Sequence, residues 1–133
     1  MTELESSAPP EDYAAAGRRL YGDADRLFGE ACFATSTHLF GLAAECAIKL
    51  FMGNIPGNRQ IPYKHLPDLI EDAKLWLRGR RRPHLLSVIS DPDYMHGWTI
   101  HTRYWPDGAF NQADCARFRQ DARQTLLQLP NAI

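Results

Sequence analysis

The sequence lacks long apolar runs and shows almost no imbalance of charge. No stretch approaches the roughly 18 consecutive apolar residues of a membrane-spanning helix. The 15 lysines and arginines nearly balance the 16 aspartates and glutamates, which gives a formal net charge of −1. Binding to nucleic acid would therefore need a local basic patch, because the global field is not positive. Residues 1–12 are acidic and proline-bearing, unlike a signal peptide, so we predict a soluble, cytoplasmic protein without a membrane partner.

Cysteine is scarce, and neither cysteine nor histidine shows metal-ligand spacing. The three cysteines, Cys32, Cys46 and Cys115, lie far apart and form no CxxC motif. An odd number of separated cysteines predicts reduced core thiols instead of a disulfide framework or a zinc site. A catalytic thiol is the less favoured alternative, because a free cysteine usually behaves as a small buried hydrophobe. The five histidines contain no HExxH motif, so no metal ion is predicted.

Motifs that bind nucleotide cofactors or present a nucleophilic serine are also absent. The chain contains no GxGxxG, no GxxxxGK[ST] and no GxSxG. These sequences form the loops that cradle phosphates or expose the serine of a hydrolase. The sequence therefore predicts no cofactor.

Helical periodicity dominates the remaining sequence. At 133 residues the chain is long enough for one core without disulfide or metal staples. Residues 1–10 lack periodicity and predict a disordered leader, while residues 11–133 predict a single helical domain. Helices are expected over 11–32, 38–52, 65–78 and 83–90, and a last one after Asn111, which with Asp114 can cap it. The fold class is all-α, an up-and-down bundle of four to five helices.

The 38–52 helix carries an apolar stripe with one charged pair beside it. Glu45 and Lys49 are four residues apart, in the order that favours a solvated surface pair worth a few tenths of a kcal/mol. If packing brings an arginine such as Arg103 or Arg78 to Glu45, the carboxylate would orient that arginine instead. The stripe recurs at helical spacing and predicts one buried face: Leu39, Leu42, Ala43, Cys46, Ala47 and Leu50.

The run Ala43–Lys49 follows His38–Gly41, with Ala14–Ala16 and Asp23-Ala24 before it and His65-Leu66 after it. In these residues the chain resembles the small helical HEPN domains. The similarity runs over residues 13–129. It implies a homodimer of a prokaryotic toxin–antitoxin or defence system, which binds RNA or nucleotides and has an antitoxin or nucleotidyltransferase-like protein as partner.

The resemblance also implies candidate catalytic residues. Active HEPN ribonucleases carry an arginine, four to six residues and then a histidine, and two such motifs face each other across a dimer. Here His101 resembles the histidine and Tyr104 the aromatic residue after it, but the position five before His101 is His96 and Arg103 follows it. In this chemistry arginine stabilises phosphate charge and histidine assists attack by the ribose 2′-hydroxyl, without metal. A metal-independent endoribonuclease is therefore one expectation, despite the incomplete motif.

A second candidate is a basic cluster between the third and fourth expected helices. Arg78 and His84, with five residues between them, form the alternative catalytic pair. Arginine forks suit phosphate, although cations also collect at solvated helix C-termini for electrostatic reasons alone. The predicted phosphate-binding residues are Lys74, Arg78, Arg80, Arg81 and Arg82.

The segment 91–110 is rich in rings and contains two prolines and two glycines. Long irregular segments are uncommon in small bundles unless they pack or have a function. One interpretation is a plug, in which Trp98, Tyr104 and Trp105 cover the bundle end and Arg103 stacks on a ring or pairs with a carboxylate. The alternative function is accordingly a catalytically inactive interaction module that docks a protein partner through loop 91–110.

Overall fold

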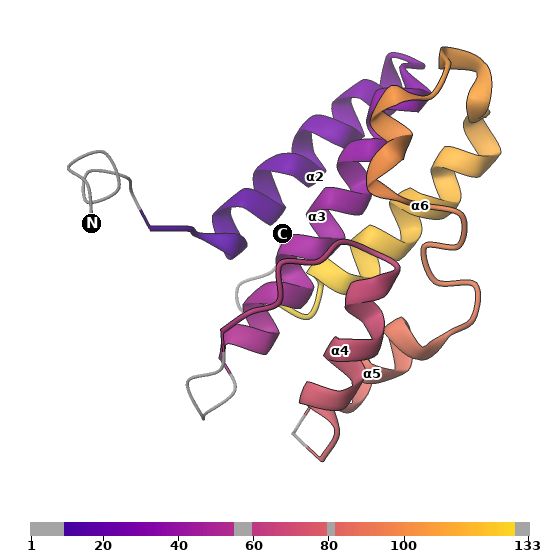
Figure 1. Cartoon of the computed structure of the whole chain (residues 1–133). Helices are drawn as coiled ribbons and strands as arrows, with labels where there is room; N and C mark the ends of the chain where they lie inside the picture. The colour runs from indigo at the N-terminus through magenta and orange to yellow at the C-terminus, as the bar shows by residue number, and fades with distance from the viewer. Residues whose placement is uncertain (1–9, 55–59, 80–81, 130–133) are drawn as a thin grey trace.

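The computed structural model describes residues 10–54, 60–79 and 82–129, and every regular element within them is helical (Figure 1). The predicted all-α bundle is therefore confirmed for this part of the chain. The expected leader lies outside the described residues except for Pro10. The α-helices are α2 (Tyr13–Gly29), α3 (Phe33–Gly53), α4 (Asp68–Leu77), α5 (Pro83–Ser90) and α6 (Gln112–Leu126), and two short 3₁₀ helices are η1 (Ile100–Tyr104) and η2 (Asp107–Ala109).

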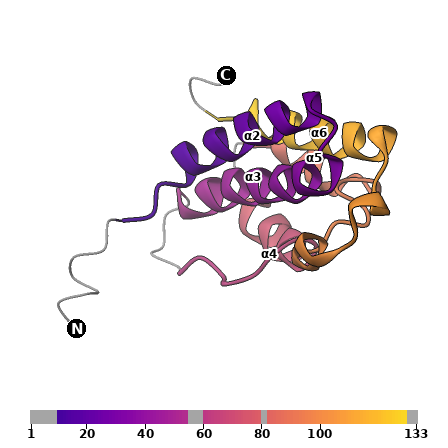
Figure 2. The ribbon, with the colours of Figure 1, turned by 90° about the horizontal axis from the view of Figure 1, so that it is seen from above.

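Three long helices lie side by side and form the body of the bundle. Helices α2 and α3 make an antiparallel hairpin, and α6 lies against α3 and runs in the same direction (Figures 1 and 2). The shorter α4 packs on α3, and α5 packs on α4 and α6. The segment between α5 and α6 carries the chain back to the hairpin turn, so it lies along α3 and contacts it through η1 and η2.

Helix α3 is buried on more sides than the predicted stripe. It contacts α2, α6, α4 and η1, so no single face of it points to the core. Ala43 and Ala47 of the stripe are buried as predicted, whereas Cys46 and the three leucines are only half-buried. The residues that fill the centre in their place are Phe40, Ala44, Ile48, Phe51 and Met52.

The predicted surface pair of Glu45 and Lys49 is wrong. The Glu45 side chain is buried, and its carboxylate pairs with His65. It therefore orients a histidine and not the arginine that was considered. The reason is tertiary: the segment between α3 and α4 passes over α3 (Figure 1), and its Leu66 N–H donates to the Glu45 carboxylate at 2.8 Å.

Trp98 fills the gap between α3 and the segment after α5. Its indole nitrogen donates to the carbonyl of Thr37 at 2.9 Å, and the side chain is buried. A Cβ placed on Gly41 would lie 1.8 Å from the ring, so only glycine allows this approach. The plug prediction is confirmed for Trp98.

The plug prediction is wrong for the two rings that follow. Tyr104 is 75 % exposed and Trp105 is 40 % exposed. The guanidinium of Arg103 does stack on a ring, but on Tyr104 at the surface, 4.7 Å from its centroid. Trp105 stacks on Phe110 with centroids 5.6 Å apart. The short turns of η1 place Thr102 inward, and this leaves its neighbours outside.

Helix α6 holds the beginning of the 91–110 segment. The Tyr94 hydroxyl and Oγ1 of Thr125 are hydrogen-bonded at 2.6 Å, and both are buried. The backbone N–H of Met95 donates to Asp121 at 2.8 Å. These contacts, together with Trp98, give the ring-rich segment a defined position against α3 and α6.

The three cysteines are free, but they are not all in the core. Cys115 is buried, Cys46 is half-buried and Cys32 is exposed at the start of α3. The core-thiol prediction is therefore wrong for Cys32. In the described ranges, no group of three or more His, Cys, Asp or Glu residues is arranged to hold a metal ion. None of the helices described there has the length and apolar character to cross a membrane.

Candidate functional site

A buried carboxylate on α3 holds the imidazole of His65. Nδ1 of His65 lies 3.0 Å from Oε2 and 3.2 Å from Oε1 of Glu45. The backbone N–H of Leu66 donates to Oε1 at 2.8 Å. The Glu45 side chain is 5 % exposed, whereas that of His65 is 42 % exposed. The pair thus connects the core to the surface, with the imidazole at the outer end.

The electrostatics of this pair fix the orientation of the imidazole. Burial raises the pKa of Glu45, and the hydrogen bonds from His65 and from the Leu66 N–H act in the opposite direction. Because a carboxylate only accepts hydrogen bonds, Nδ1 of His65 is the donor. The neutral ring then has its lone pair on Nε2, and no hydrogen bond joins Nε2 to any described residue. An imidazole held in this way is prepared to accept a proton.

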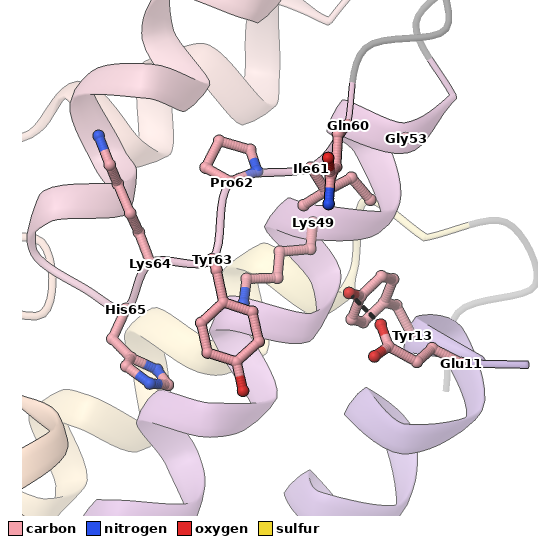
Figure 3. Close-up of a pocket in the computed structure, with 10 residues that line it drawn as sticks. All are labelled: Glu11, Tyr13, Lys49, Gly53, Gln60, Ile61, Pro62, Tyr63, Lys64 and His65. Atoms are coloured by element: carbon pink, nitrogen blue, oxygen red, sulfur yellow. Dashed lines mark hydrogen bonds between the residues drawn. The ribbon is translucent and has the colours of Figure 1, made fainter. Parts of the chain in front are cut away.

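His65 lines two adjoining cavities. The smaller, of about 350 Å³, has His65 and His101 in its wall, with residues 63–68 on one side and Thr99 and Ile100 on the other. We call it the two-histidine cavity. The larger, of about 610 Å³, lies between the start of α2, the end of α3 and residues 60–65 (Figure 3). We call it the Lys49 cavity, after the lysine in its wall.

The helix η1 places three of the predicted site residues on the surface, and one of them lines the two-histidine cavity. The Thr99 side chain accepts the backbone N–H of His101 at 3.2 Å and so caps η1. His101, Arg103 and Tyr104 are exposed, and His101 lines the cavity. The structure therefore brings three of the four predicted catalytic residues to one short element.

His96, the fourth predicted residue, is elsewhere. It lines a different cavity, of about 410 Å³, between α4 and residues 89–99. The distance from His101 along the chain is short, but the buried Trp98 lies between them in the sequence, and the residues on either side of His96, Met95 and Gly97, have positive φ angles of 49° and 88°. His96 is thus not part of the arrangement around His65.

His38 of α3 contacts both the buried Trp98 and the helix η1. Its ring stacks on Trp98, with centroids 6.0 Å apart and planes 9° from parallel. Nδ1 of His38 and Oγ1 of Thr102 are hydrogen-bonded at 3.3 Å. Burial lowers the pKa of His38, and repulsion by Arg103, and by His65 when it is protonated, lowers it further. His38 therefore supports η1 from below as a neutral ring.

The predicted basic cluster is only partly described. Arg80 and Arg81 lie outside the described residues. Lys74 pairs with Glu71 at 3.6 Å, and the Arg82 guanidinium lies 4.8 Å from the centroid of the Phe51 ring.

The alternative catalytic pair of this cluster lies outside both cavities around His65. Arg78 ends α4 and His84 lies in the first turn of α5, and both side chains are exposed. Neither lines either cavity around His65.

The sequence analysis did not include His65 among the candidate site residues. One signal was present: Glu45 interrupts a strongly apolar run, and a buried carboxylate needs a partner. The partner lies 20 residues away along the chain, and spacing alone does not identify it.

Comparison with models of protein families, with curated proteins and with solved structures finds no match to this chain.

Proposed function

We propose that this protein binds single-stranded RNA and cleaves it without a metal ion. One observation carries the proposal: His65, whose Nδ1 is held by the buried Glu45, shares a cavity with His101. Metal-independent cleavage of RNA needs one group that removes a proton from the ribose 2′-hydroxyl and a second that protonates the leaving oxygen. Two imidazoles at one cavity are suited to these roles.

The reaction uses both rings. Nε2 of His65 takes the proton of the 2′-hydroxyl while the 2′-oxygen forms a bond to phosphorus. The bond between phosphorus and the 5′-oxygen breaks, and protonated His101 gives its proton to that oxygen. The products are a 2′,3′-cyclic phosphate and a free 5′-hydroxyl. Arg103, on the same short helix as His101, contributes the positive charge that the phosphate oxygens require.

Binding relies on the exposed ring beside these residues. Tyr104 is mostly exposed and already stacked by Arg103. Base stacking on an aromatic side chain is sequence-tolerant and contributes about 1–3 kcal/mol per base. A strand that places one base on Tyr104 would present its backbone to Arg103 and His101.

The resemblance to HEPN domains supports the same class of activity. On that basis the proposal includes a cytoplasmic homodimer in a toxin–antitoxin or defence system, with an antitoxin or nucleotidyltransferase-like partner. The assignment of residues differs from that family's pattern, because His65 comes from the segment before α4.

The test is cleavage of end-labelled single-stranded RNA in EDTA. We expect His65→Ala and His101→Ala each to lower the rate by roughly 10²- to 10⁴-fold. Arg103→Ala should lower the rate as well, and His84→Ala serves as the matched control, since His84 is an exposed histidine away from the cavity. Absence of cleavage by the wild type at high protein excess would refute the nuclease. Loss of cleavage in His84→Ala alone would move the site to the Arg78 and His84 pair.

A second function is favoured by the exposed rings of loop 91–110. Tyr104 and Trp105 are adjacent and exposed, with Arg103 beside them. Tyrosine, tryptophan and arginine dominate the energetics of protein interfaces. In this alternative the protein is an inactive module that docks a partner protein. Co-purification with the product of the neighbouring gene, lost in Tyr104→Ala and Trp105→Ala, would support it, while a wild type that cleaves RNA would contradict it.

A further inference from the structure

We propose that the Lys49 cavity binds one nucleotide, with Tyr63 as the stacking surface for its base and Lys49 as the contact for its phosphate. The inference deepens the proposed function, since it places a second nucleotide of the strand beside the two-histidine cavity. It rests on the proposed function for the identity of the strand, but the observations at Tyr63 and Lys49 are separate from those that support the cleavage.

The cavity has the size and the wall of a nucleotide site. Its volume of about 610 Å³ lies within the range of small-molecule pockets. Tyr63 is completely exposed at its edge, and Nζ of Lys49 lies 6.0 Å from the centroid of the Tyr63 ring (Figure 3). The cavity therefore combines an exposed aromatic ring, on which a base can stack, with a cation that can bind a phosphate.

Lys49 is the cation available to a phosphate in this cavity. It forms no ion pair with any carboxylate of the described residues, whereas Lys64, also in the wall, pairs with Asp72 at 2.7 Å. Glu11 is the acidic residue in the wall, and it accepts a hydrogen bond from the Tyr13 hydroxyl. Glu45 acts on Lys49 electrostatically from beyond ion-pair distance, so a phosphate bound at Lys49 would be its close anionic partner.

The position of the cavity fits a continuous strand. Tyr63, Lys64 and His65 belong to the walls of both cavities, so the two are adjacent across one stretch of backbone. A nucleotide in the Lys49 cavity therefore shares a wall with His65, the residue of the proposed proton transfer. Single-stranded RNA thus crosses residues 63–65 from one cavity to the other.

The test uses a probe that cannot be cleaved. A fluorescent single-stranded 2′-O-methyl RNA pentamer lacks the attacking hydroxyl, and its binding is measured by anisotropy at several salt concentrations. We expect Tyr63→Ala to weaken binding about 5- to 30-fold and Tyr63→Phe to change it less than about twofold, because the stacking face remains. Lys49→Met should weaken binding and reduce the salt slope by about one phosphate contact.

Two controls make the result specific. Leu75→Ala removes another exposed apolar side chain, on α4, and should bind like the wild type. A pentamer of the same backbone without bases should bind the wild type at least as weakly as the intact pentamer binds Tyr63→Ala, because it loses every base stack. Circular dichroism of each variant establishes that the helices are retained.

The outcomes separate this inference from the proposed function. If the wild type binds the pentamer in a Tyr63-dependent way but does not cleave RNA, the nucleotide site stands and the nuclease is refuted. If the wild type cleaves RNA while Tyr63→Ala and Lys49→Met bind the pentamer normally, the nuclease stands and the nucleotide site is overturned. No binding of the pentamer by the wild type also overturns it.

Discussion

Nδ1 of His65 lies 3.0 Å from a carboxylate oxygen of Glu45, although the two residues belong to different elements and are separated by the α3–α4 connection. The same carboxylate accepts the backbone N–H of Leu66. One buried side chain on α3 thus fixes both the backbone that enters α4 and the direction of an imidazole at the surface. The candidate site depends on this contact more than on any local motif.

Glu45→Gln should lower RNA cleavage by about 100-fold or more without unfolding the protein. The amide of glutamine can donate to Nδ1 of His65, which moves the ring proton to Nε2 and removes the lone pair that accepts the substrate proton. The effect should appear in kcat and leave KM nearly unchanged, which a purely structural defect would not do. Glu71→Gln, an exposed change on α4, is the control. An unchanged kcat in Glu45→Gln would show that the carboxylate does not position His65 for catalysis.

Gly41→Ala should destabilise the fold by about 3 kcal/mol. The added Cβ would lie 1.8 Å from Cε2 of Trp98, and the hydrogen bond from the indole to Thr37 prevents the ring from moving away. Gly22→Ala on α2 is the matched control, because a Cβ there meets no atom within 4 Å. It should be neutral or stabilising by up to about 1 kcal/mol through helix propensity. Urea unfolding of the two variants decides the matter, and equal midpoints would contradict the packing of Trp98 described above.

Lowering the pH through the histidine range should destabilise the wild type partly through His38. Burial, Arg103 and His65 lower the pKa of His38 from 6.5, so the unfolded chain binds this proton more readily than the folded protein. Its contribution to the free energy of unfolding is therefore complete above about pH 6.5 and is lost as the pH falls below it. His38→Phe keeps a ring against Trp98 and removes the titration. Urea unfolding between pH 7.5 and 5.0 should show a smaller loss of stability in His38→Phe, and an equal loss would refute this role.

Features set by neighbouring residues were predictable from the sequence. Asn111 and Asp114 form the capping box at the start of α6, with Asp114 N–H donating to Asn111 at 2.8 Å. Pro83 lies in the first turn of α5, as predicted. Both depend on residues within one helical turn, where spacing along the chain determines spacing in space.

The start of the third expected helix was not predictable from neighbouring residues. The prediction began it near His65, whereas α4 begins at Asp68. The Leu66 N–H is bound by Glu45, so residues 65–66 serve the contact to α3 before the helix starts. A distant carboxylate here decided a boundary that local propensity placed three residues earlier.

The sequence by itself determined the all-α class and most helix positions, because helical periodicity, caps and proline positions act over a few residues. It did not predict η1, which lies in the segment 91–110 that was expected to be irregular. Only the tertiary structure decided which charged and aromatic side chains are buried. The sequence predicted Glu45 of α3 to be a solvated partner of Lys49. In the structure Glu45 is the buried partner of His65, because another segment covers it. Burial depends on which distant segments pack together, and the energy of a carboxylate changes far more with burial than with its position on an isolated helix.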